Sequence, residues 1–227
     1  DDPNVVAVVG RIRSYWPRHY IPQWYLIFTA YRIRLWRIMQ FCLRYGQTWK
    51  YTNASPIIPG GGSIYRTTAL QHIRIDVPGM IIEDFNMTFN VHHQRLGTIA
   101  FNPTTRTLDQ EPYSLRDYIK QIWRWYLGFF QTVRYHGIWP SWFFFTMAFF
   151  LFEMLLGSIF FLLMPFFLVE LLMSGKESIT FSVGLGGSSI TLLGLVVTFI
   201  VVDYLITIIV ALIERKPLLL IYGLGFL

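Results

Sequence analysis

Two long apolar runs in the last third of the chain constrain its fold more than any other feature. Residues 142–173 are nearly all apolar, and residues 190–213 form a second run of the same kind. A helix of about 20 apolar residues is long enough to cross the hydrocarbon core of a membrane. The chain therefore predicts two transmembrane helices, and the apolar residues 218–227 predict the start of a third.

Charge divides the chain near residue 140. Residues 1–140 hold sixteen of the nineteen basic residues and eight of the thirteen acidic ones, a net charge of +8, whereas residues 141–227 carry a net charge of −2. Excess arginine beside membrane spans is typical of the cytoplasmic side. We therefore expect a cytoplasmic domain over residues 1–140 and a multi-pass region over residues 141–227 in the plasma (inner) membrane.

The basic domain is expected to contact anionic lipid headgroups or phosphorylated substrates. Nucleic acid is not an expected partner, because the arginines are spread among apolar and aromatic positions and no RNA- or DNA-binding motif is present. The single cysteine, Cys42, excludes an internal disulfide and fits a reducing compartment. The Gly- and Ser-rich residues 174–189 are expected to form a loop on the outer side.

Residues 23–46 are apolar enough to suggest a further span, but four arginines argue against it. Each arginine costs roughly 2.5–3.5 kcal/mol at the centre of a membrane helix. We expect a helix packed on the domain, and a position near the bilayer surface stays open. The arginines are Arg32, Arg34, Arg37 and Arg44.

The rest of the first 140 residues predicts a mixed α/β fold. Val5–Gly10 favours a buried strand, Thr98–Asn102 a short strand and Asp84–Gln94 a helix. Ser114 is expected to cap a further helix, with Asp117 at the third helical position.

An acidic pair, Glu83-Asp84, precedes a pentad, Gln121-Ile122-Trp123-Arg124-Trp125. On a helix, the first, fourth and fifth residues of the pentad share a face. A carboxylate can take a proton from a sugar hydroxyl, an arginine can neutralise a diphosphate, and an indole can stack on a sugar ring. The plainer alternatives are surface acids at a helix N-terminus, interfacial tryptophans and, for Gly60–Gly62, an ordinary turn.

In this order the motifs resemble the membrane-integrated family 2 glycosyltransferases, which include the hyaluronan, chitin, cellulose and poly-N-acetylglucosamine synthases. Residues 1–10 resemble the strand that follows the family's metal-binding Asp-x-Asp motif, and residues 60–66 resemble its glycine-rich loop near the acceptor. Glu83-Asp84 resembles its acidic pair, and residues 121–125 match its Gln-x-x-Arg-Trp motif.

The resemblance implies the C-terminal half of a GT-A-like α/β domain followed by transmembrane helices. The nucleotide-binding half and the ligands of a Mg²⁺ or Mn²⁺ ion are expected upstream of residue 1, with no metal ligand in this chain. The segment by itself is therefore expected to be inactive.

The reaction that the resemblance implies is an inverting transfer from a UDP-sugar to a growing β-linked polysaccharide or a glycolipid. Asp84 would be the catalytic base beside Glu83, and Arg124 would neutralise the diphosphate. The acceptor would be bound by Gln121, Trp125, Gly60, Gly61, Gly62 and Ser63. Two alternatives stay open: transfer of one sugar to a membrane lipid, and a non-enzymatic transporter or scaffold. Export of the polymer by the same protein also stays open.

Overall fold

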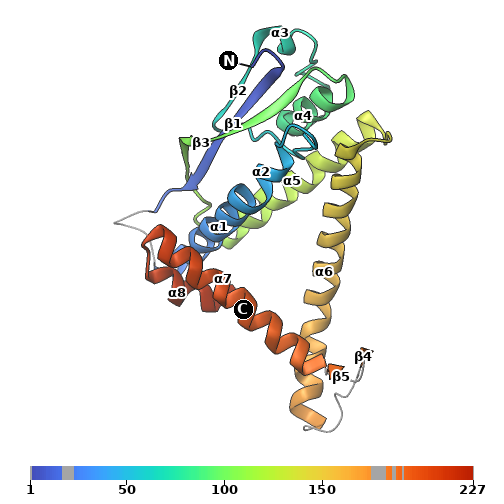
Figure 1. The fold of residues 1–227 in the computed structure, drawn as a ribbon. Helices are drawn as coiled ribbons and strands as arrows, with labels where there is room; N and C mark the ends of the chain where they lie inside the picture. The colour runs from blue at the N-terminus through green and yellow to red at the C-terminus, as the bar shows by residue number, and fades with distance from the viewer. Residues whose placement is uncertain (1, 17–22, 175–182, 186–187, 191, 227) are drawn as a thin grey trace. The chain divides into compact units, whose positions relative to one another are not determined.

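The structure is a computed structural model that describes residues 2–16, 23–174, 183–185, 188–190 and 192–226. Contacts divide the chain into two compact units, residues 1–148 and residues 149–227 (Figure 1). The predicted division near residue 140, between a cytoplasmic domain and a membrane region, stays a prediction.

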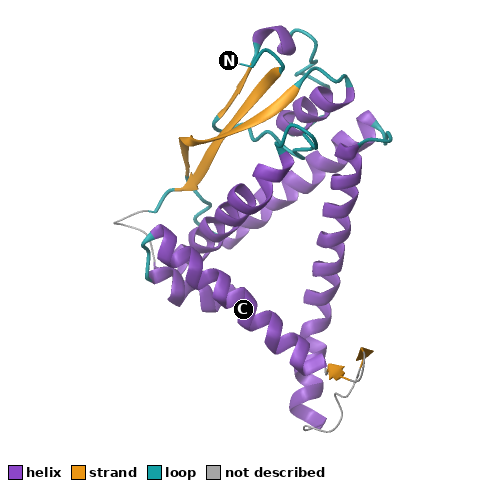
Figure 2. Ribbon diagram, in the orientation of Figure 1, coloured by secondary structure: helices purple, strands orange, loops and turns teal. Residues whose placement is uncertain are grey.

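The first unit contains a three-stranded mixed sheet (Figure 2). Its central strand, β1 (Val5–Ser14), pairs antiparallel with β2 (Ser63–Tyr65) and parallel with β3 (Thr98–Asp109). The predictions of strands at residues 5–10 and 98–102 are confirmed in position but were too short. Both strands continue past an irregularity in their register, where Gly10 faces Asn102 and Arg11 faces Arg106.

Gln40 completes the hydrogen bonding of β1 beyond the end of β2. The Ile12 amide donates to Gln40 Oε1 at 2.8 Å, and Gln40 Nε2 donates to the Ile12 carbonyl at 2.9 Å. The buried side-chain amide thus replaces a neighbouring strand, because it offers one donor and one acceptor as a backbone residue does.

Residues 23–47 form a helical segment that packs on the domain, as predicted. It begins with a 3₁₀ turn (Gln23–Tyr25), continues as α1 (Leu26–Ile38) and a π-helical turn (Met39–Leu43), and ends with α2 (Arg44–Gln47). Its buried residues include apolar side chains and one arginine of α1: Tyr25, Leu26, Ala30, Arg32 and Ile33.

Three further helices follow β2 in the first unit: α3 (Thr67–Leu70), α4 (Glu83–His93) and α5 (Leu115–His136). The prediction that Ser114 caps α5 is confirmed, because the Asp117 amide donates to Ser114 Oγ at 3.1 Å. The sheet and the helices share an apolar core: Val6, Ala7, Val9, Ile58, Ala69, Ile73, Val91 and Ile99.

Helix α6 (Trp142–Ser174) runs from the end of the first unit into the second. The second unit also contains α7 (Leu192–Glu214), α8 (Leu218–Gly223) and a 3₁₀ turn (Leu224–Phe226). Within the described residues, two helical segments are long and apolar enough to cross a membrane, Trp142–Phe166 and Val197–Glu214. This rests on length and composition alone. The predicted third span stays a prediction.

The expected loop at residues 174–189 is partly wrong. Residues 183–185 (β4) and 188–190 (β5) pair antiparallel, and Gly184 faces Ser189. In the sequence, a Gly-Gly dipeptide between two short segments is one of the signals that favour a hairpin. The part of the predicted loop at residues 175–182 lies outside the described residues.

Candidate active site

The acidic pair forms the first turn of α4, and the preceding glycine-rich loop lies against it. Asp84 Oδ2 accepts a hydrogen bond from the Gly60 amide at 3.2 Å, and Asp84 Oδ1 accepts one from the Phe85 amide at 2.7 Å. Thr88, one turn later, accepts a hydrogen bond from the Ile58 amide at 2.8 Å. The start of α4 and the loop are therefore joined by backbone amides.

Burial raises the pKa of the Asp84 carboxyl above its ordinary value. The amides of Gly60 and Phe85 oppose this rise, since they stabilise the ionised form, and the charge of Glu83 adds to it. Arg124 lies close enough for its positive charge to lower the same pKa. Asp84 and Arg124 therefore share one electrostatic environment, although they come from two helices.

The glycine-rich loop needs a glycine at one position. Gly62 has a φ of +75°, and a Cβ there would lie 2.2 Å from Thr107 Oγ1. A Cβ at Gly60 or Gly61 would make only ordinary contacts, with the nearest atoms at 3.8 and 3.6 Å. Ser63 closes the loop, because its hydroxyl donates to the Pro59 carbonyl at 2.6 Å.

Gln121 and Trp125 lie against a buried arginine of α1. Gln121 Oε1 accepts a hydrogen bond from Arg32 Nη2 at 3.0 Å. The Trp125 ring packs on the same guanidinium, with Arg32 Cζ 4.5 Å from the ring centroid. Both side chains are partly exposed, so each also has surface available to a ligand.

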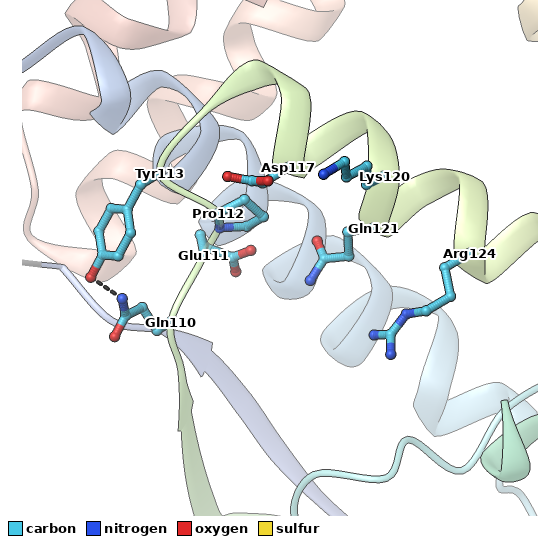
Figure 3. A pocket seen from close by; sticks show the side chains of 8 residues that line it. All are labelled: Gln110, Glu111, Pro112, Tyr113, Asp117, Lys120, Gln121 and Arg124. Carbon is cyan, nitrogen blue, oxygen red and sulfur yellow. Dashed lines mark hydrogen bonds between the residues drawn. The ribbon is translucent and has the colours of Figure 1, made fainter. Parts of the chain in front are cut away.

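A cavity of about 470 Å³ lies between α5 and the segment that follows β3. In Figure 3, Gln121 and Arg124 extend from α5 to the side on which Glu111 lies. The cavity combines amides, two cations, two carboxylates and one aromatic ring, a set that suits a polyhydroxylated, partly anionic ligand. Its lining residues are Gln110, Glu111, Pro112, Tyr113, Asp117, Lys120, Gln121 and Arg124.

The structure thus places the residues singled out from the sequence in two adjoining groups. Glu83, Asp84 and Gly60 form one group, and Gln121 and Trp125 form the other, on the face of α5 that packs against Arg32. Arg124 links the groups, because it lines the cavity and acts on the pKa of Asp84.

Sequence reasoning missed several residues of this region. From the sequence, Arg32 was used only as an argument against a membrane span. Glu111 and Lys120 were not considered as site residues. Tyr65 was also missed; burial and then the charge of Asp84 raise the pKa of its phenol, so the hydroxyl stays protonated beside the acidic pair. A buried arginine needs a counterion, and that is the only signal that could have suggested a carboxylate partner for Arg32.

Comparison with known families decides the class of protein. The sequence model described as "Glycosyl transferase family group 2" matches residues 4–213. The chain belongs to this family. The mixed sheet with flanking helices fits the GT-A-like fold. No curated protein matches the chain.

Family 2 glycosyltransferases move a sugar from a nucleotide-sugar donor to an acceptor, and a divalent metal ion is common among them. Among the described residues of this glycosyltransferase, no three His, Cys, Asp or Glu side chains gather as metal ligands would. Those residues therefore do not fit a complete metal site.

Proposed function

We propose that this family 2 glycosyltransferase is an inverting, membrane-bound enzyme that extends a β-linked polysaccharide. The donor is a UDP-sugar, and transfer takes place at the cytoplasmic face of the plasma (inner) membrane. Asp84 is the catalytic base, Arg124 neutralises the diphosphate, and Gln121 and Trp125 bind the acceptor.

The position of Asp84 is the observation that carries this proposal. Its carboxylate is held by two backbone amides at the first turn of α4, where the helix dipole favours a negative charge. Partial burial raises its pKa. A carboxylate with a raised pKa is a stronger base than an exposed one, yet it is still ionised when its pKa lies below the working pH.

The chemical step is a single displacement. The acceptor hydroxyl oxygen attacks the anomeric carbon of the donor, and its proton passes to the Asp84 carboxylate. The bond between the anomeric carbon and the diphosphate oxygen breaks, and UDP leaves with the bonding electrons. The new glycosidic bond forms on the opposite face of the sugar, so the configuration is inverted.

Two positively charged side chains on α5 support the proposed departure of the diphosphate. Arg124 and Lys120 are one helical turn apart and both line the cavity. A cation positioned before the reaction stabilises the negative charge that develops on the leaving group. The partly exposed ring of Trp125 offers an apolar surface on which a sugar ring can stack.

Two further features support a position at a bilayer. The first candidate span begins six residues after α5 ends, at Trp142, and the second is Val197–Glu214. Helix α5 also carries an exposed apolar stripe with the spacing of one helix face, which suits a membrane surface. The stripe consists of Leu115, Ile119, Trp123, Tyr126, Leu127 and Phe130.

The test is product analysis with the full-length protein in membranes. Labelled UDP-GlcNAc, UDP-Glc and UDP-GlcA are supplied in turn, and the products are sized. Asp84→Asn is compared with Asp76→Asn, a matched change at an exposed aspartate. We expect a long polymer from one donor, its loss in Asp84→Asn and its retention in Asp76→Asn.

Other outcomes identify the alternatives. A product that carries one sugar on a lipid would show that the enzyme modifies a lipid and does not polymerise sugars. Incorporation that persists in Asp84→Asn would show that Asp84 is not the base. Sugar transfer that is absent from the wild-type protein with every donor would contradict the proposed function as a whole.

A further inference from the structure

Arg32 is a buried cation whose contacts converge on the pentad helix. Its side chain is 2% exposed and forms an ion pair with Glu111, with Arg32 Nε and Glu111 Oε2 3.5 Å apart. Its guanidinium lies 4.9 Å from the ring centroid of Tyr118 and 4.5 Å from that of Trp125. Tyr118, Gln121 and Trp125 all lie on one face of α5, so a single arginine contacts three residues over about two turns of that helix.

Glu111 is itself held in place. Its Oε1 accepts hydrogen bonds from Ser14 Oγ at 2.5 Å and from Trp36 Nε1 at 3.4 Å, and its backbone carbonyl accepts one from the Tyr25 hydroxyl. The Arg32–Glu111 pair therefore ties β1 and the 3₁₀–α1 segment to the residues that follow β3. Because the pair is anchored on both sides, Arg32 has little freedom to move.

The contact with Arg32 determines how the Gln121 amide is turned. An arginine offers only donors, so the Gln121 atom that faces Nη2 must be the oxygen. Gln121 Nε2 is then the atom left to donate to a ligand in the cavity that Gln121 lines. A flipped amide would place two donors against each other and is excluded.

We propose that Arg32 is a positioning residue that orients Gln121 and Trp125 for the acceptor sugar. Arg32 holds the Gln121 amide so that Nε2 donates to an oxygen atom of the acceptor sugar. It also packs on the Trp125 ring, so that the sugar stacks on the part of the ring that stays exposed. Glu111 neutralises Arg32, so the positive charge that faces the diphosphate comes from Arg124 and Lys120, which line the cavity. This inference rests on the proposed function.

The orientation is set before any substrate binds. A site built this way loses less conformational entropy on binding than one that must rearrange. The loss of Arg32 should therefore weaken acceptor binding more than donor binding. A residue that merely holds the fold together would instead lower the amount of active enzyme without changing either KM.

The experiment uses the full-length protein in membranes, with chitotetraose as acceptor for UDP-GlcNAc or cellotetraose for UDP-Glc, whichever donor the wild type uses. The variants are Arg32→Lys, Gln121→Ala and the double variant, with Arg34→Lys as a matched change two residues along α1. We expect the acceptor KM to rise about tenfold in Arg32→Lys, as for a lost hydrogen bond, with the donor KM unchanged. The rise in acceptor KM of the double variant should be smaller than the product of the two single effects, because Arg32 acts in part through Gln121.

Two results would overturn the inference. One is an acceptor KM for Arg32→Lys that equals that of Arg34→Lys, and the other is a double variant in which the two effects multiply. Absence of transfer by the wild type would instead overturn the proposed function, and the inference with it, so the two failures are distinguishable.

A second variant tests the same inference if Arg32→Lys does not fold. Gln121→Glu keeps an oxygen for Arg32 but removes the Nε2 donor. If Nε2 faces the acceptor, Gln121→Glu should raise the acceptor KM as much as Gln121→Ala does. A KM close to that of the wild type would show that the other amide atom faces the acceptor, which contradicts the assigned orientation.

Discussion

The backbone amide of Gly60 donates a hydrogen bond to Asp84 Oδ2 over 3.2 Å. Burial raises the pKa of the proposed base, and the N–H of a loop residue opposes this rise because it stabilises the ionised carboxylate. Gly60 and Asp84 are brought together by two separate parts of the chain, the loop before β2 and the first turn of α4.

Replacement of Gly60 tests this bond. Gly60→Pro removes the N–H, so the pKa of Asp84 should rise further and sugar transfer near neutral pH should fall. Gly60→Ala keeps the N–H, and its Cβ would lie no closer than 3.8 Å to the acidic pair. We expect near wild-type rates for Gly60→Ala and a clear loss for Gly60→Pro, measured as kcat/KM for the donor. Equal rates in the two variants would contradict the role of the amide.

The pH dependence of transfer should report the influence of Arg124 on Asp84. The ionised carboxylate is the base, so kcat/KM should fall as the pH drops through the pKa of Asp84, which burial has raised. Arg124 lowers that pKa, so Arg124→Gln should move the acidic limb of the profile to higher pH. Arg116→Gln, an exposed change on the same helix, is the control and should leave the limb unchanged.

The close contact between α5 and the residue before α4 should control the distance between Arg124 and the acidic pair. Gly128 lies one turn after Arg124 on α5, and a Cβ there would come within 2.7 Å of the Ile82 side chain, just before the acidic pair. Gly128→Ala should push the start of α4 away and reduce kcat at least several-fold. Ile82→Ala in the same protein should restore part of the rate by removing the clashing atoms. No recovery in the double variant would contradict this explanation.

Gly62 should matter for stability through both its conformation and its surroundings. Gly62→Ala meets a φ of +75° and a Thr107 oxygen 2.2 Å away, whereas Gly79→Ala meets a φ of +79° with no atom within 4 Å. The φ alone costs about 1–3 kcal/mol in each variant. We therefore expect a larger fall in melting temperature for Gly62→Ala, measured on the detergent-solubilised protein. The difference between the two variants isolates the steric part.

Local signals allowed much of the first unit to be predicted. The cap at Ser114 depends on a residue three positions away, so the sequence pattern was sufficient. The second half of β3 could not be predicted in this way, since Pro103 and the following threonines read as a turn. The strand continues because Arg106–Asp109 pair with Arg11–Ser14, a contact that no local pattern contains.

In the candidate site, too, local signals identify some residues and long-range contacts determine the others. The acidic pair and the pentad could be identified from residue type and spacing. The position of Arg32 could not, because its burial is acceptable only with Glu111, a carboxylate distant in the sequence. Likewise, the glycines of residues 60–62 look alike in the sequence, but only Gly62 has a positive φ among them.

The way in which Asp84 is held has a consequence for protein engineering. Its immediate hydrogen-bond donors are backbone amides, so they have no side chain that could be copied to another scaffold. Grafting an aspartate and an arginine onto a foreign helix pair would transfer the functional groups without the environment that sets their proton affinity. A designer who wanted this activity elsewhere would have to transplant the whole path of the loop from Ser55 to Ser63 together with the first turn of α4.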